Sequence, residues 1–439
     1  MGLNIKPVIV LSRGAGVFVN ESGRMEMVLD NEDTGARIRS LLEEMKAETG
    51  PHASILEPLA VSDPADFKPL FRDGQDIDAL LVYFLGVTPI EQLLKWQGPI
   101  IAFSGPCTPA MALYAVGEER RERPGLFVAL DYTDIRRTLR IVGAKKALAD
   151  TRVLMFGFPP SWHLRWYGFP DLERLRRRFG VEFVPVELRE LIETVPKVDP
   201  KAAARIADEW AENAREISGP SPDHIRQSVT AYLAMSRIME KKGAGAMVIN
   251  CLEITQAKKF SDKIINPCMG MQTMRDRGIP AGCEMDIPCL LTMILLGQLT
   301  NAPAFLGNIV RADPEKNEIK LSHCILPTRM PGFDKDPLPY TLCDLHGAKG
   351  VTAYTHINPG QPVTLARARR NLERITASGG ELTDSEDTCF CRNTLTIRVP
   401  DARRFVQLAE GNHHAMVFGD CLEDLEALCG LLDCEFRTV

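Results

Sequence analysis

The strongest constraint on the fold is a regular alternation of strand and helix signals in the first half of the chain. Short continuous apolar runs occupy residues 7–12, 78–86 and 99–105, whereas residues 36–48 carry apolar side chains at helical spacing. Such alternation is typical of parallel strands joined by crossover helices. The N-terminal third is therefore predicted to be an α/β domain.

A second series of the same kind begins at 152–158 and ends with a long helix feeding the apolar run 245–251. After about residue 310 the segments become short, rich in β-branched residues and separated by Gly, Pro and Asn, which favours antiparallel strands. The predicted fold is α/β, with two consecutive Rossmann-like parallel-sheet domains followed by a C-terminal antiparallel β-barrel-like domain. The predicted domains are 1–148, 149–310 and 311–439.

Composition narrows the class of protein. The formal charge of −6 comes from intermixed acidic and basic residues, which argues against nucleic-acid binding. The longest apolar run, Ile287–Leu299, is shorter than the ~20 residues of a membrane span and is predicted to be a buried helix. The twelve cysteines contain no CxxC pair, so we interpret them as free thiols in a reducing cytoplasm.

Two carboxylates follow predicted parallel strands. Glu253 comes directly after the run 245–251, and Asp286 follows the short predicted strand 279–283. Ligands bind at the carboxyl ends of such strands, so both side chains are expected on one rim. The alternatives are structural, because Asp286 before an apolar helix with Pro288 in its first turn is a suitable N-cap, and a strand-end glutamate is usually solvated.

Two adjacent histidines, His413 and His414, precede an apolar run near the C-terminus. On an extended segment their side chains point to opposite sides, so at most one of them faces a given site. A single histidine in this position is commonly a structural residue. Together with two carboxylates, however, one imidazole makes a plausible ligand set for a divalent metal.

The run DRGIPAGCEMDIPCLLTMILLGQLTNAPAFLGNI resembles the signature of the L-fucose isomerase-like family, whose relatives include L-arabinose isomerase. VINCLEI and the Asn412-His413 pair resemble further segments of that family. The resemblance implies that Glu253, Asp286 and His413 bind Mn²⁺ or another divalent cation. It also implies a homo-oligomer.

The activity that the resemblance implies is aldose–ketose isomerisation of a free sugar through a metal-stabilised enediolate. Glu253 and Asp286 are then the candidate catalytic acid and base. The candidate substrate-binding residues are Asn412, His323 and His346. Two alternatives remain at this point, a non-catalytic sugar-binding or regulatory protein and a metal-dependent epimerase or lyase with the same enediolate chemistry.

Overall fold

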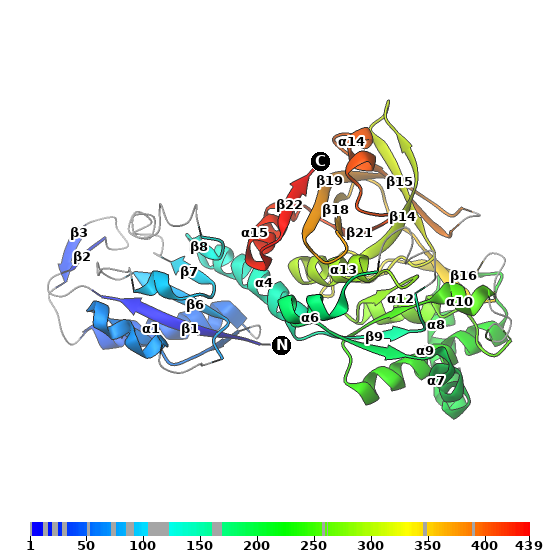
Figure 1. Cartoon of the computed structure of the whole chain (residues 1–439), viewed down its shortest axis with the longest axis horizontal. Coiled ribbons are helices and arrows are strands. Elements are labelled where there is room, and N and C mark those ends of the chain that lie inside the picture. Colours follow the sequence, from blue (N-terminus) through cyan, green and yellow to red (C-terminus); the bar gives the residue numbers. More distant parts are fainter. Residues whose placement is uncertain are drawn as a thin grey trace. The chain divides into compact units, whose positions relative to one another are not determined.

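The chain forms two compact units, Met1–Lys146 and Ala147–Val439 (Figure 1). The structure is a computed structural model that describes residues 2–11, 16–19, 25–28, 33–50, 53–71, 76–84, 92–103, 123–159, 169–256, 260, 262–345, 349–388 and 391–439. The domain boundaries predicted from the sequence stay predictions. Among the described helices, none combines the length and apolar character needed to cross a membrane.

The first unit contains a parallel sheet in the order β4-β1-β6-β7-β8, with β5 also paired to β1. Its central strands are buried along most of their length, as their continuous apolar sequences predict. The strands are β1 Leu3–Val10, β4 Ala53–Ile55, β5 Leu59–Val61, β6 Ala79–Phe84, β7 Ile100–Phe103 and β8 Leu126–Ala129, with a separate hairpin of β2 Gly16–Val19 and β3 Met25–Val28. The helices are α1 Asp33–Thr49, η2 Pro64–Phe71, η3 Leu93–Lys95 and α4 Tyr132–Ala149.

The second unit begins with another parallel sheet, in the order β10-β9-β12-β13. Its strands are β9 Arg152–Phe156, β10 Glu182–Val186, β12 Ala246–Ile249 and β13 Ala281–Gly282. Its helices are α6 Leu172–Phe179, α7 Leu188–Thr194, η4 Val195–Lys197, α8 Pro200–Asn213, α9 Pro222–Lys242, α10 Cys251–Gln256, α12 Cys268–Asp276 and α13 Ile287–Thr300. Local sequence sets several ends: Ser221 accepts a hydrogen bond from the amide of His224 at the start of α9, and Gly243 ends that helix in the left-handed conformation.

The C-terminal part of the second unit is a closed antiparallel barrel of six strands. The order is β18-β21-β14-β15-β20-β19, and pairing of β18 with β19 closes it. The strands are β14 Phe305–Asp313, β15 Glu318–His323, β18 Pro362–Ala368, β19 Arg374–Glu386, β20 Asn393–Arg398 and β21 His413–Phe418. The other elements are β11 Glu216–Ser218, β16 Tyr340–Asp344 and β17 Val351–Thr355 in a small sheet, helices α14 Ala402–Leu408 and α15 Leu422–Leu432, and β22 Glu435–Thr438, which is parallel to β19. Two parallel sheets followed by an antiparallel barrel confirm the predicted fold class.

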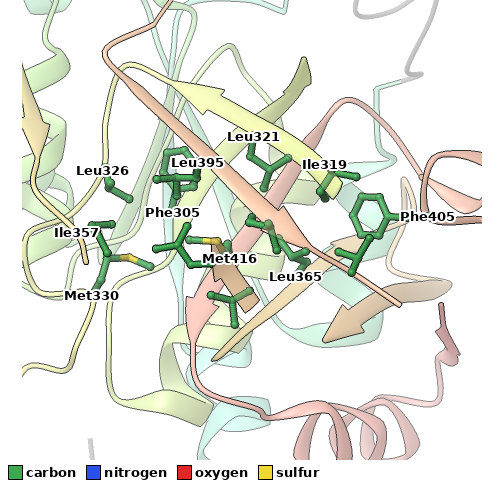
Figure 2. Close-up of a cluster of buried hydrophobic side chains, with 14 of the residues drawn as sticks. Phe305, Ile319, Leu321, Leu326, Met330, Ile357, Leu365, Leu395, Phe405 and Met416 are labelled. Atoms are coloured by element: carbon green, nitrogen blue, oxygen red, sulfur yellow. The ribbon is translucent and has the colours of Figure 1, made fainter. Parts of the chain in front are cut away.

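Alternate residues of the barrel strands fill its interior. Figure 2 shows this cluster, whose buried side chains come from all six barrel strands, from the segments around Leu326, Met330 and Ile357, and from α14. Its labelled members are Phe305, Ile319, Leu321, Leu326, Met330, Ile357, Leu365, Leu395, Phe405 and Met416. The two-residue period of a strand explains the packing, because every second side chain points inward.

Helix α13 connects the parallel sheet to the barrel. It packs against β13 of the parallel sheet and against β18 and β21 of the barrel. Its apolar residues are buried almost throughout, which confirms the buried helix predicted from residues 287–299. The start of α13 therefore lies where the parallel sheet and the barrel meet.

Candidate metal centre

The carboxyl edge of the parallel sheet positions the first acidic side chain. Strands β12 and β13 are neighbours in parallel register, with Val248 opposite Gly282. Directly after β12, the Asn250 side chain accepts a hydrogen bond from the amide of Glu253 at 3.2 Å and donates one to the carbonyl of Phe158 at 2.6 Å. Glu253 thus lies in the first turn of α10 and is half-buried.

The segment after β13 has an unusual backbone. Glu284 and Met285 both adopt left-handed φ angles, of 54° and 60°. Such angles are disfavoured for residues with a Cβ, and strained backbone of this kind is concentrated at functional sites. The amide of Met285 donates to the carbonyl of Ile249 at the end of β12, which secures the turn. The strand β13 ends at Gly282, so Glu284 and Asp286 lie after it, on this turn and at the start of α13.

Glu284 points toward two buried histidines of the barrel. His323 ends β15 and His413 begins β21, and each is only 4% exposed. The Nε2 atoms of His323 and His413 lie 3.9 and 3.8 Å from the two carboxylate oxygens of Glu284. One potential ligand atom from each residue lies within 4.8 Å of the others. Within the described residues, Glu284, His323 and His413 are the group of this kind that the structure brings together.

Asp286 lies outside that group and contacts the other ring nitrogen of His413. Its carboxylate accepts a hydrogen bond from His413 Nδ1 at 2.9 Å and two from the Arg367 guanidinium at 2.8 and 3.2 Å. It also caps α13 by accepting from the amide of Cys289 at 3.0 Å. Burial alone would raise the pKa of Asp286, but Arg367 and His413 outweigh it and hold that pKa far below its usual range. An ionised carboxylate can only accept, so Nδ1 of His413 is the donor to Asp286, and Nε2 is the ring nitrogen that faces Glu284.

His414 lies on the opposite face of β21. Its ring packs beside Phe405 at a centroid distance of 5.0 Å, and its Nδ1 donates to the carbonyl of Asn412. Burial, followed by the nearby Arg367, lowers the pKa of His414 to about 3, so this ring is neutral. The Asn412 side chain donates to Asn308 of β14. The alternation expected for adjacent histidines is therefore present.

A buried arginine supports the segments that carry Glu284 and His323. Arg275 of α12 is 1% exposed and donates to the carbonyl of Ala281 at 2.8 Å and to that of Ile325 at 3.3 Å. Its remaining nitrogen lies 3.7 Å from the sulfur of Cys283. One side chain thereby connects the residues preceding Glu284 with those following His323.

The structure places the candidate residues from the sequence differently from one another. The structure brings His413 and His323 together with Glu284, and it places Asp286 against His413. Glu253 lies on the neighbouring strand end and is outside the three-residue group. Asn412 precedes His413 but its side chain pairs with Asn308, and His346 lies outside the described residues. The roles assigned to these residues stay predictions.

The chemistry of Glu284, His323 and His413 fits a divalent cation. The buried Nε2 of His413 and Nδ1 of His323 have no hydrogen-bond partner within the described part of the chain. Burial, together with nearby His413 and Arg275, lowers the pKa of His323 well below its ordinary value, so its ring is a neutral ligand. Within the described ranges, no lysine or arginine forms an ion pair with Glu284. One carboxylate and two imidazoles suit a borderline divalent metal with open positions.

Comparison with known proteins gives two kinds of result. No family model matches the sequence. The chain is 26% identical over 284 residues to a sulfoquinovose isomerase from Clostridium sp. (strain MSTE9), covering 60% of this chain and 59% of that protein. It is 25% identical over 199 residues to one from Priestia megaterium, covering 43% of this chain and 41% of that protein. Each match spans less than two thirds of the relative's own length. The relatives' names agree with the sugar-isomerase class that the sequence resemblance implies.

Sequence reasoning gave Glu284 no role and missed Arg367 altogether. Arg367 was detectable in principle, because a charged residue inside the apolar strand sequence PVTLARA indicates a buried partner. Glu284 gave no such signal, since its importance depends on a backbone conformation that local sequence does not reveal. His323 was assigned to substrate, and only the barrel pairing shows that its ring meets His413 at a centroid distance of 5.5 Å.

Proposed function

We propose that this chain is a metal-dependent aldose–ketose isomerase acting on a free sugar. The observation that carries the proposal is the group formed by half-buried Glu284 and the buried His323 and His413 at the carboxyl edge of a parallel sheet. The names of the relatives support the reaction class. Sulfoquinovose, the sugar in those names, is the first substrate to test.

In this proposal Glu284, His323 and His413 hold the cation. Asp286, which the resemblance implied as a ligand, instead holds His413 in position, because Arg367, His413 and the helix amide already engage its oxygens. Mn²⁺ is the proposed metal. Two histidines with one carboxylate also suit Fe²⁺, so elemental analysis belongs in the test.

A bound divalent cation would supply Lewis-acid stabilisation of negative charge on the sugar's neighbouring oxygens. The protein must then move one proton between C1 and C2. Asp286 is a poor base because its pKa is held far below its usual range by Arg367 and His413 despite burial. Glu253 is the proposed proton carrier, since its carboxylate is half-buried beside the neighbouring strand end and, among the described residues, a 3.5 Å contact from the Asn250 amide is the one hydrogen bond that it accepts.

Gly157 shapes the space beside Glu253. It follows β9 with a left-handed φ of 88°, and a Cβ there would lie 3.3 Å from Glu253 Oε2. Any side chain at 157 would therefore both strain the backbone and displace the Glu253 carboxylate. The lack of a side chain at Gly157 therefore leaves room for the Glu253 carboxylate in this position.

The test is proton exchange at C2. Purified protein is loaded with Mn²⁺ and incubated in D₂O with sulfoquinovose and a panel of aldoses, and NMR follows deuterium incorporation and ketose formation. Chelator should abolish both signals, and Glu253→Gln should abolish exchange while retaining bound metal. Sugar binding without exchange in any metal form would contradict the proposal. Exchange with no ketose would assign the site to epimerase chemistry instead.

A further inference from the structure

A pair of cysteines lies at the end of α15, within the second unit. Asp433 has a left-handed φ of 51°, and its amide donates to the carbonyl of Gly430 at 3.2 Å. The amide of Cys434 donates to the carbonyl of Cys429 at 3.0 Å. These two bonds define a Schellman motif, whose geometry brings the side chains at its first and last positions into contact. Here those positions are Cys429 and Cys434.

The two thiols have different surroundings. Cys429 is 1% exposed, whereas Cys434 is half-buried, and the Cys429 thiol donates a hydrogen bond to the Cys434 sulfur. A reagent in solution therefore reaches Cys434 first. Cys429 lies behind it, within reach of any adduct that Cys434 forms.

A guanidinium reinforces this asymmetry. Arg178 of α6 donates to the carbonyls of Leu432 and Asp433 at the end of α15. The hydrogen bond from Cys429 and the charge of Arg178 lower the pKa of Cys434, against the effect of burial. By contrast, burial raises the pKa of Cys421, at the other end of the same helix, to about 11.

We propose that Cys429 and Cys434 form a redox-active dithiol that low-molecular-weight disulfides convert to an intramolecular disulfide. The Cys434 thiolate attacks one sulfur of the reagent, forming a mixed disulfide and releasing one small thiolate. The Cys429 sulfur, after losing its proton to solvent, attacks Cys434 Sγ and expels the second small thiol. Two protein thiols are oxidised and one disulfide is reduced to two thiols, so atoms and electrons balance.

The experiment treats the reduced full-length protein with glutathione disulfide. Free thiols are then alkylated, and peptide mass spectrometry locates each modification. A Cys429–Cys434 disulfide should form before other cysteines react and should revert with dithiothreitol. Cys429→Ser should stop at a mixed disulfide on Cys434, and Cys434→Ser should leave Cys429 unmodified. Cys421→Ser, on the same helix, is the matched control and should behave as the unaltered chain.

Arg178 provides a second test that does not remove a sulfur. Arg178→Gln should slow mixed-disulfide formation about threefold, because a smaller thiolate fraction is partly offset by higher nucleophilicity. Arg178→Lys should keep most of the rate. The proposal is overturned if Cys429 and Cys434 remain alkylatable after other cysteines have been oxidised. It is equally overturned if Cys429→Ser and the unaltered chain accumulate the same mixed disulfide.

Discussion

Asp286 and Glu284 are two residues apart, yet the fold treats their charges in opposite ways. Asp286 receives hydrogen bonds from Arg367, His413 and a helix amide, so the protein itself neutralises it. Glu284 stands on a strained turn opposite the imidazoles of His323 and His413, with no lysine or arginine of the described residues paired to it. The better-solvated, less partnered carboxylate is therefore the one suited to bind an added cation.

The largest effect on metal binding is expected when the carboxylate of Glu284 is removed. Glu284→Gln should weaken Mn²⁺ binding by more than about 100-fold, because it removes the one charged ligand of the group. Isothermal titration calorimetry measures this directly. Glu173→Gln, which alters an exposed carboxylate of α6, is the control. If Glu284→Gln binds Mn²⁺ normally and Asp286→Asn does not, the two residues have been assigned in reverse.

The next largest effect on metal binding is expected at Asp286, whose charge Arg367 and His413 compensate. Asp286→Asn should lower the free energy of unfolding by about 3–5 kcal/mol, because Arg367 stays buried without its anion. Mn²⁺ affinity should fall only about 10–100-fold, as expected for a residue that orients a ligand. Urea denaturation of metal-free protein measures the first quantity. The double variant Asp286→Asn/Arg367→Met should lose less unfolding free energy than the sum of the losses in the two single variants. Losses that simply add would argue against a coupled pair.

A substitution of Arg275 tests how the segments that carry Glu284 and His323 are held in position. Arg275→Met leaves the carbonyls of Ala281 and Ile325 without this donor, so we expect a loss of about 1–3 kcal/mol in unfolding free energy. Mn²⁺ affinity should fall about tenfold because Glu284 and His323 lose a shared support. Denaturation and calorimetry on the same preparation separate the two effects. Destabilisation with unchanged affinity would show that Arg275 has no role in positioning the ligands.

His414 should give the smallest change in metal binding. His414→Gln should change Mn²⁺ affinity by less than about threefold, because His414 is at most an outer contact of the metal group. The pKa of His414 is about 3 in the folded chain and ~6.5 when unfolded, so the unfolded state takes up a proton first as pH falls. The unaltered protein therefore loses unfolding free energy as the pH falls below about 6.5. Below that pH, His414→Gln should lose about 1.4 kcal/mol less of its unfolding free energy per pH unit than the unaltered protein does. Urea titrations from neutral to acidic pH check this, and identical slopes would contradict it.

Several features were predictable because they depend on local pattern. Continuous apolar runs identified the parallel strands, and β-branched segments with Gly and Pro turns identified the barrel. Asp286 before Pro288 indicated the cap of α13, which the structure confirms. The two-residue period of a strand separated His413 from His414. The Asn-His resemblance pointed to His413, which is the histidine that the structure places beside Glu284.

The sequence by itself determined the order of elements, the buried helix α13 and the presence of acidic residues at neighbouring strand ends, because these follow from periodicity and capping within a few residues. Tertiary structure decided how the charges are used. Arg367 reaches Asp286 from 81 positions away, and His323 meets His413 only because the barrel closes. The left-handed turn at Glu284 exists because β12 and the start of α13 hold both of its ends. Long-range pairing of this kind depends on the whole fold, and local sequence does not specify which partner a buried charge meets.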